Sequence, residues 1–170
     1  MIDIRKANEA DYPVIDNITE RTFEHVQCNN EHLSLAKTCN LDIFIPELSL
    51  VAAISGNRIV GHIYFVRVSI GFIYPSLALA QVVVVPEFQE LGIGSLMVNK
   101  AHERAKELGY SSIISLGYRR FLSRLGYRSL SGFGIYFPYG IVEDQCVAIE
   151  LYPGSLRKIN GMVSFPLELL

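Results

Sequence analysis

Two glycines, Gly92 and Gly94, separate a run of valines at Val82–Val85 from a stretch with helical periodicity. Residues without side chains let backbone N–H groups approach an anion closely, and a helix start adds unsatisfied donors and about half a positive charge. This spacing suits a phosphate or pyrophosphate. It is not a P-loop, because no Lys-Ser or Lys-Thr follows Gly94, and Met97 occupies the third glycine position of a dinucleotide fingerprint. From the residues alone, close packing of a tight turn explains the glycines equally well.

The elements that would position this loop follow from hydrophobic periodicity. Helical spacing predicts helices at 8–26, 31–41, 93–108 and 119–125. Branched and aromatic residues predict strands at 2–4, 48–54, 59–68, 77–85, 112–116 and 145–151. We expect two apolar stripes, Val14, Ile15, Ile18, Thr22 and Val26 on the first helix and Ile93, Leu96, Met97, Ala101, Ala105 and Leu108 on the third. Turn residues at 55–58 predict a hairpin, and helix–strand alternation after it predicts an α/β (mixed α+β) fold around one sheet.

Length, composition and net charge exclude several classes of protein. A chain of 170 residues suits a single domain over 1–170, and 50% hydrophobic residues with a mean hydropathy of +0.28 exclude a disordered protein. A formal net charge of −2 argues against a general nucleic-acid binder. Cys28, Cys39 and Cys146 are too far apart in sequence for a CxxC metal site, and their odd number does not suit a disulfide framework. We find neither a signal peptide nor an apolar run of about 20 residues, so we expect a cytoplasmic protein that binds no metal and no membrane.

The near-neutral total charge hides a difference between segments. Residues 1–60 hold five basic and nine acidic residues, whereas residues 108–142 hold four arginines and no acidic residue. Four arginines without acidic neighbours suit a phosphorylated ligand, although a solvated helix face explains them equally well. The acidic first segment mildly favours a cationic partner.

Val82–Gly94 resembles the signature of the GNAT superfamily of N-acetyltransferases. There, a strand ending in Val-x-Pro precedes Gln-x-x-Gly-x-Gly and a helix that holds the pyrophosphate of coenzyme A. Further segments resemble a bacterial branch often called YhbS-like, namely 49–52, 59–63, 115–117, 124–127 and 150–156. The resemblance therefore covers most of the chain.

This resemblance implies a mixed, mostly antiparallel sheet that splays where the Val82–Val85 strand parts from the Ser112–Leu116 strand. Acetyl-CoA would lie in that gap as co-substrate. A backbone N–H near Val83 would polarise the thioester oxygen, an interaction worth about 3 kcal/mol in comparable sites. The residues implied in coenzyme binding are Val82, Val83, Val84, Gln89, Glu90, Leu91, Gly92, Ile93, Gly94, Ser95, Arg119 and Arg124. We expect an amine acceptor, and a monomer or homodimer.

Acetyl transfer to an amine also needs a base for the ammonium proton and an acid for the leaving thiolate. The resemblance places the usual acid, a tyrosine, at Leu122, which has no hydroxyl; Tyr118 and Ser123 are the nearest hydroxyl groups. His62 is a candidate base by its ordinary pKa of about 6.5, though a hydrogen-bonded structural histidine is more common. Gln81 cannot act as a base and would orient substrate or water. Further candidates that a solvated helix face also explains are Glu20 and Glu24.

The sequence therefore predicts an acetyl-CoA-dependent N-acetyltransferase acting directly on a small-molecule, peptide or protein amine. A catalytically weak acyl-CoA-binding sensor or interaction protein is the alternative, because Leu122 lacks a transferable proton. Transfer to oxygen, or of longer acyl chains, is also open. No motif identifies the acceptor.

Overall fold

The computed structural model describes residues 1–23, 35–138 and 145–164, and it divides the chain into two compact units. The first unit contains Met1–Phe65 and Gln81–Arg104, and the second contains Val66–Ala80 and Ala105–Leu169. Two long strands, β3 (Arg58–Ile70) and β4 (Tyr74–Val84), contribute residues to both units. The expectation of a single domain over 1–170 stays a prediction.

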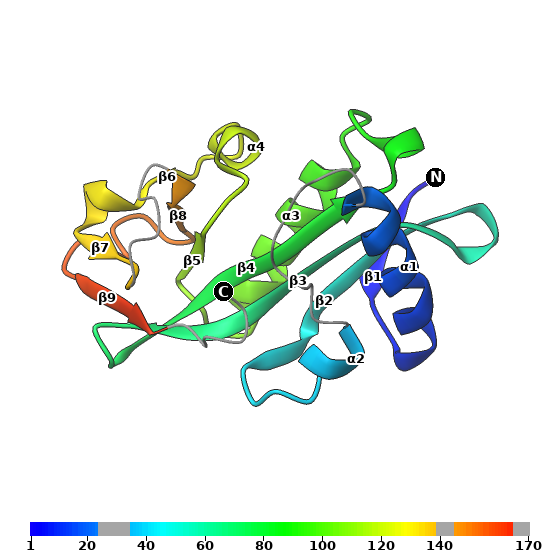
Figure 1. Cartoon of the computed structure of the whole chain (residues 1–170). Helices are drawn as coiled ribbons and strands as arrows, with labels where there is room; N and C mark the ends of the chain where they lie inside the picture. The colour runs from blue at the N-terminus through cyan, green and yellow to red at the C-terminus, as the bar shows by residue number, and fades with distance from the viewer. Residues whose placement is uncertain (24–34, 139–144, 165–170) are drawn as a thin grey trace. The chain divides into compact units, whose positions relative to one another are not determined.

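The first unit contains a sheet with the order β1-β2-β3-β4. Its other elements are β1 (Asp3–Lys6), the 3-10 turn η1 (Glu9–Asp11), α1 (Tyr12–Phe23), α2 (Leu35–Thr38), β2 (Phe44–Ile54), η2 (Ser55–Asn57), η3 (Pro86–Phe88) and most of α3 (Ile93–Glu107). Figure 1 shows α1 and α3 at different faces of these strands. A Cβ added at Gly61 of β3 would lie 3.0 Å from Cε of Met97 on α3. Residues beside Gly61 in β3 point the opposite way, so His62 faces the side that carries η1 and α1.

The second unit continues the sheet in the order β3-β4-β5-β8-β6, and β9 pairs with β3 and β7. Its elements are β5 (Ser112–Ser115), α4 (Arg119–Ser123), β6 (Arg128–Ser129), η4 (Leu130–Phe133), β7 (Ile135–Tyr136), β8 (Val147–Glu150) and β9 (Gly161–Ser164). Strand β5 runs parallel to β4, from Leu77 opposite Ile113 to Leu79 opposite Ser115. It runs antiparallel to β8. The sequence did not predict β6, β7 or β9; β6 and β7 contain two residues each, too few to show an alternation.

Strand β2 starts earlier than the predicted 48–54 and runs through Pro46. Strand β1 pairs only with Leu50–Ala53 of β2. Pro46 therefore lies beside no β1 residue, and its missing N–H costs no hydrogen bond to that strand. Gly109 ends α3 as predicted: it adopts a φ of +90°, and its N–H donates to the Lys106 carbonyl.

The buried stripes of α1 and α3 are narrower than the sequence predicted. Val14 is 44% exposed, whereas Ile15, Ile18 and Thr19 are buried at i, i+3 and i+4 spacing. On α3, Ile93, Met97, Ala101 and Ala105 are buried as predicted, but Leu96 and Leu108 are exposed and Val98 is buried instead. Val14 and Leu96 lie about 90° or more around their helices from the centres of the buried stripes, whereas Leu108 follows Glu107, the last residue of α3. Val26, and residues 31–34 of the second predicted helix, lie outside the described residues.

Candidate functional site

The loop between β4 and α3 carries two left-handed residues at alternate positions. Glu90 has a φ of +62° and Gly92 a φ of +83°, with Leu91 exposed between them. Backbone conformations of this kind turn successive N–H groups toward one concavity, which suits an anion. The N–H of Leu96 donates to the Gly92 carbonyl, so the helical ladder starts at Gly92 and the N–H groups of the first turn have no acceptor within the helix. The 15-residue α3 directs its positive dipole end at the same place.

Side chains of the first unit fix this loop to the sheet. The Gln89 amide donates to the Val84 carbonyl at 2.8 Å. The Arg58 guanidinium lies 5.4 Å from the centre of the Phe88 ring, and Arg21 on α1 pairs with Glu87 at 3.3 Å. The glutamine at position 89 thus has a structural task, the fastening of the loop to the last residue of β4. Its role in coenzyme binding stays a prediction.

The end of β4 continues beyond its pairing with β5. The register between the two strands stops at Leu79 and Ser115, and β4 runs on to Val84. On the β3 side the ladder is continued at Val85, whose N–H donates to the Val60 carbonyl. Val82 and Val83 are almost fully buried. On the side away from β3, the register places no described strand beside Val82–Val84, as in the splayed sheet that the family resemblance implies.

Gln81 precedes these valines and is held by α1. Its Nε2 donates to Thr19 Oγ1 at 2.9 Å, and Thr19 Oγ1 donates in turn to the Ile15 carbonyl at 2.8 Å. Because the single hydroxyl proton of Thr19 is used by Ile15, Thr19 can only accept from Gln81, which fixes the orientation of the amide. The Gln81 carbonyl oxygen therefore points away from Thr19. Sequence reasoning missed Thr19, since nothing in its local pattern marks a contact with a residue 62 positions away.

His62 is fully buried in the first unit, which a catalytic base in contact with substrate would not be. Its Nε2 and Ser49 Oγ are hydrogen-bonded at 2.9 Å, and its ring stacks on Tyr64 with centroids 5.5 Å apart. Burial lowers the pKa of His62 to about 3, and the nearby Asp11 carboxylate opposes this only in part. Among the residues that the structure describes, none forms a hydrogen bond with its Nδ1. The imidazole is therefore neutral at pH 7; its role as a base stays a prediction, and this environment weighs against it.

Tyr118, Arg119 and Arg124 lie in the second unit. Tyr118 adopts a φ of +60° immediately before α4 and is partly exposed, and Arg124 is exposed. Leu122 is fully buried, so its position in α4 belongs to the core of that unit. Arg128 pairs with Glu150 at 3.3 Å and lies 4.9 Å from the centre of the Phe133 ring. The charge count over 108–142 did not include this partner, because Glu150 lies outside that range, on β8.

Of the other residues considered from the sequence, Glu20 is exposed on α1 and Cys146 is buried, whereas Glu24 and Cys28 lie outside the described residues.

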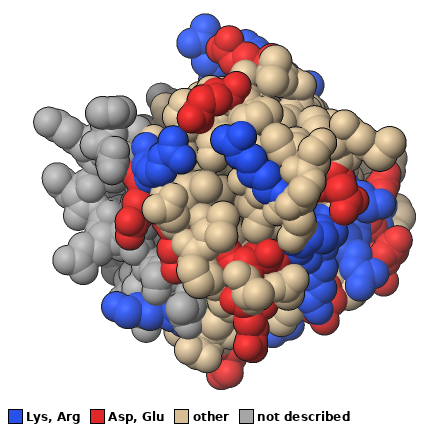
Figure 2. Space-filling model, turned by 90° about the vertical axis from the view of Figure 1, so that its right-hand side faces the viewer, with Lys and Arg blue, Asp and Glu red and all other residues tan. Residues whose placement is uncertain are grey.

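Figure 2 shows acidic and basic side chains interspersed over the face that it presents. Within the described ranges, no group of three or more His, Cys, Asp or Glu side chains is placed to hold a metal ion. No helix among them is long and apolar enough to span a membrane.

Comparison with known families and curated proteins gives consistent matches. The model of the Acetyltransferase (GNAT) family matches residues 9–127. Uncharacterized N-acetyltransferase YjhQ of Escherichia coli K12 is 33% identical over 104 residues, which are 59% of this chain and 57% of that protein. The chain thus spans little more than half of YjhQ. Uncharacterized N-acetyltransferase YhbS of the same strain is 23% identical over 163 residues, which are 95% of both chains.

Solved structures give the same fold. The crystal structure of YhbS from Escherichia coli in complex with CoA superposes with a TM-score of 0.86 at 20% identity, covering 98% of this chain and 91% of that one. A GNAT family acetyltransferase from Brucella melitensis in complex with acetyl-CoA superposes with a TM-score of 0.76 at 23% identity, covering 100% and 99%. The predicted mixed α/β GNAT fold is confirmed.

Proposed function

Because the chain belongs to the GNAT family of acetyltransferases, we propose that it transfers the acetyl group of acetyl-CoA directly to a primary amine of a small molecule, peptide or protein. The observation that carries the proposal is the loop Gln89–Ser95, with left-handed Glu90 and Gly92 at the start of α3. Two of the solved structures with the same fold contain CoA or acetyl-CoA. In this proposal the backbone N–H groups of the loop bind the pyrophosphate, as helix N-termini do for other anions.

The end of β4 would hold the reactive part of the co-substrate. Its backbone on the side away from β3 pairs with the pantetheine arm as with a further strand, and an N–H near Val83 donates to the thioester oxygen. Val82 and Val83 are buried, which keeps water from the developing negative charge and strengthens that hydrogen bond. Backbone groups do this work, so the identity of the valine side chains matters little.

The reaction would proceed by direct attack. The neutral amine nitrogen forms a bond to the acetyl carbon, and the carbon–sulfur bond breaks after the tetrahedral intermediate. One proton leaves the nitrogen and one reaches the thiolate, so that the products are the amide and CoA-SH. With His62 neutral and fully buried, we propose that a water chain carries the amine proton and that Gln81 orients it. Tyr118 remains our candidate for protonation of the thiolate.

Two glycines with the same backbone conformation provide a matched test. Gly92 (φ +83°) lies in the loop and Gly56 (φ +74°) in the β2–β3 hairpin, and a Cβ at either position would meet nothing within 4 Å. Gly92→Val and Gly56→Val therefore impose a comparable strain, on the order of 1–2 kcal/mol. We expect only Gly92→Val to lose CoA binding by calorimetry and thiol release with an amine panel. Equal CoA affinity in both variants would contradict the proposal.

The buried Leu122 favours a second candidate, an acyl-CoA-binding sensor with little turnover. A leucine that belongs to the core cannot protonate a thiolate. The same assays separate the two candidates: thiol release that depends on both acetyl-CoA and amine supports the enzyme, whereas CoA binding without turnover supports the sensor.

A further inference from the structure

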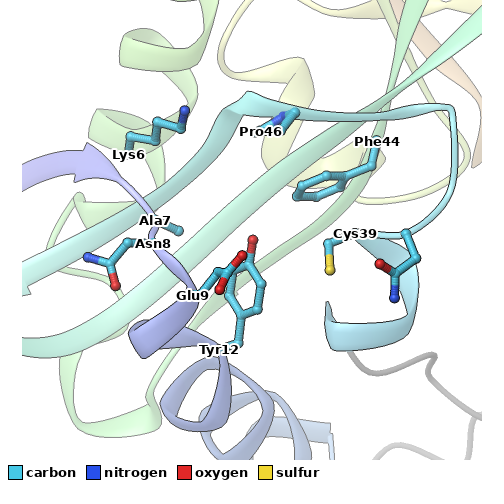
Figure 3. Close-up of a pocket in the computed structure, with 9 residues that line it drawn as sticks. Lys6, Ala7, Asn8, Glu9, Tyr12, Cys39, Phe44 and Pro46 are labelled. Carbon is cyan, nitrogen blue, oxygen red and sulfur yellow. The ribbon is translucent and has the colours of Figure 1, made fainter.

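A pocket of about 510 Å³ lies in the first unit, apart from the loop before α3. It is formed where β1 ends, α1 begins and β2 starts, and its lining includes Lys6, Glu9, Tyr12 and Phe44. Figure 3 shows the Glu9 carboxylate close to the Tyr12 ring, and the Lys6 amino group at the rim, directed away from both. Glu9 and Tyr12 are close enough to interact electrostatically.

The charges of the lining favour a cation. No basic side chain among the described residues forms an ion pair with Glu9, whereas the Lys6 ammonium is 3.9 Å from the Glu47 carboxylate. Burial raises the pKa of the Tyr12 hydroxyl, and the neighbouring Cys39, Glu9 and Asp11 raise it further, so the phenol stays neutral. Two aromatic rings and the Glu9 carboxylate attract an organic ammonium group, through cation–π attraction and a charge-assisted hydrogen bond. A single carboxylate provides too few oxygens for a divalent metal ion.

Helix α1 connects this pocket to the proposed reaction centre. Tyr12 begins α1 at the pocket, and Thr19 on the same helix accepts the hydrogen bond from Gln81 of β4. Seven residues of helix rise by about 10 Å. Across the sheet, β1 and β4 are separated by three strand spacings, about 14 Å. Both estimates place the pocket within reach of one extended molecule whose reacting end lies beside Gln81.

We propose that the Glu9 pocket binds the distal ammonium group of an acceptor that carries two amines about 10–14 Å apart, such as a long α,ω-diamine or a basic peptide. This inference rests on the proposed function, since one amine is the group acetylated. The pocket then selects acceptors by length: a shorter diamine cannot reach both places, and a monoamine gains nothing from Glu9. Cationic acceptors also suit the excess of acidic residues in 1–60.

The test compares α,ω-diamines of increasing length with monoamines of the same chain length, in the thiol-release assay with acetyl-CoA. We expect the lowest KM for diamines that span about 10–14 Å. Glu9→Gln should raise that KM about tenfold, as expected for one lost charge-assisted hydrogen bond, and leave the kinetics with monoamines unchanged. Glu9 is exposed, so the substitution does not threaten the fold. Lys6→Gln is the matched control at the opposite rim, and it should leave the KM unchanged or lower it.

The outcomes are separable from those of the proposed function. If no amine is acetylated, the proposed function fails, and calorimetry of the long diamine with wild type and Glu9→Gln still tests the pocket. Weaker binding of the diamine by Lys6→Gln than by Glu9→Gln would show that Glu9 does not hold the ammonium group and would overturn the inference. Equal KM values for diamines and monoamines, or no effect of Glu9→Gln, would also overturn it.

Discussion

Because His62 is buried, we expect the protein to lose stability as the pH falls. A substitution of His62 should remove this loss. Burial lowers its pKa to about 3 in the folded protein, against about 6.5 in the unfolded chain. Between these values the unfolded chain binds a proton that the folded protein does not, so the free energy of unfolding falls as the pH falls below 6.5. At 1.36 kcal/mol for each pH unit, lowering the pH from 7 to 5 costs about 2 kcal/mol.

The assay is urea unfolding of wild type, His62→Gln and Ser49→Ala at pH 7 and pH 5. Glutamine has no titrating ring and can still form a hydrogen bond with Ser49, so we expect the extra loss of about 2 kcal/mol to disappear in His62→Gln. Ser49→Ala removes the partner of Nε2 but leaves the ring buried, so it should be less stable at both pH values and keep the pH dependence. Equal pH dependence in wild type and His62→Gln would refute the reasoning.

The same variant also tests His62 as a base. A group with a pKa of about 3 produces no inflection of the rate between pH 6 and 8. We therefore expect wild type and His62→Gln to have the same profile shape in that range. An inflection near pH 6.5 that disappears in His62→Gln would establish the base role and contradict the burial argument.

Two further predictions concern the loop before α3 and the start of the chain. Glu90→Gly should raise the free energy of unfolding by about 1 kcal/mol, because it relieves a left-handed non-glycine residue. Both Glu90→Gly and Glu90→Gln should bind CoA a few-fold more tightly, because each removes a negative charge near the proposed anion site. Calorimetry that shows weaker CoA binding for Glu90→Gln would contradict that site. Asp11→Asn should lower the free energy of unfolding by about 2 kcal/mol at pH 7, since Asp11 accepts two hydrogen bonds from the Arg5 guanidinium, at 2.7 and 3.0 Å. The Arg5 guanidinium holds the pKa of that carboxyl below its usual range, so the contribution is present above pH 4 and lost as the pH falls further; an unchanged difference between wild type and variant at pH 2 would refute this account.

The sequence predicted the long elements and their order because their periodicity extends over several turns or pairs of residues. Strands β2, β3 and β4 and helix α3 all formed where branched residues or helical spacing placed them. The two-residue strands β6 and β7 were missed, because their structure depends on partners far along the chain. The pairing of Ser129 with Val147 shows this dependence.

The same difference between local and long-range structure applies to the candidate site. A binding loop made of backbone N–H groups needs only a local conformation, and Gly92 marks that conformation in the sequence. Sites made of side chains that meet across the fold leave no such mark. Thr19 contacts Gln81, and Ser49 contacts His62, because α1 and the strands pack together in the fold.

The difference between sites made of backbone groups and sites made of side chains also affects how specificity arises in the proposed enzyme. Backbone groups would hold the co-substrate, which all acetyl-CoA-dependent relatives share, so that part of the site tolerates wide variation of side chains. The Glu9 pocket consists of side chains at the ends of three elements, where a single substitution changes its charge without disturbing the sheet or α3. Acceptor preference can therefore change by substitution at Glu9 or Tyr12 while CoA affinity stays constant. The prediction that Glu9→Gln alters the KM for diamines but not the CoA affinity follows from this separation.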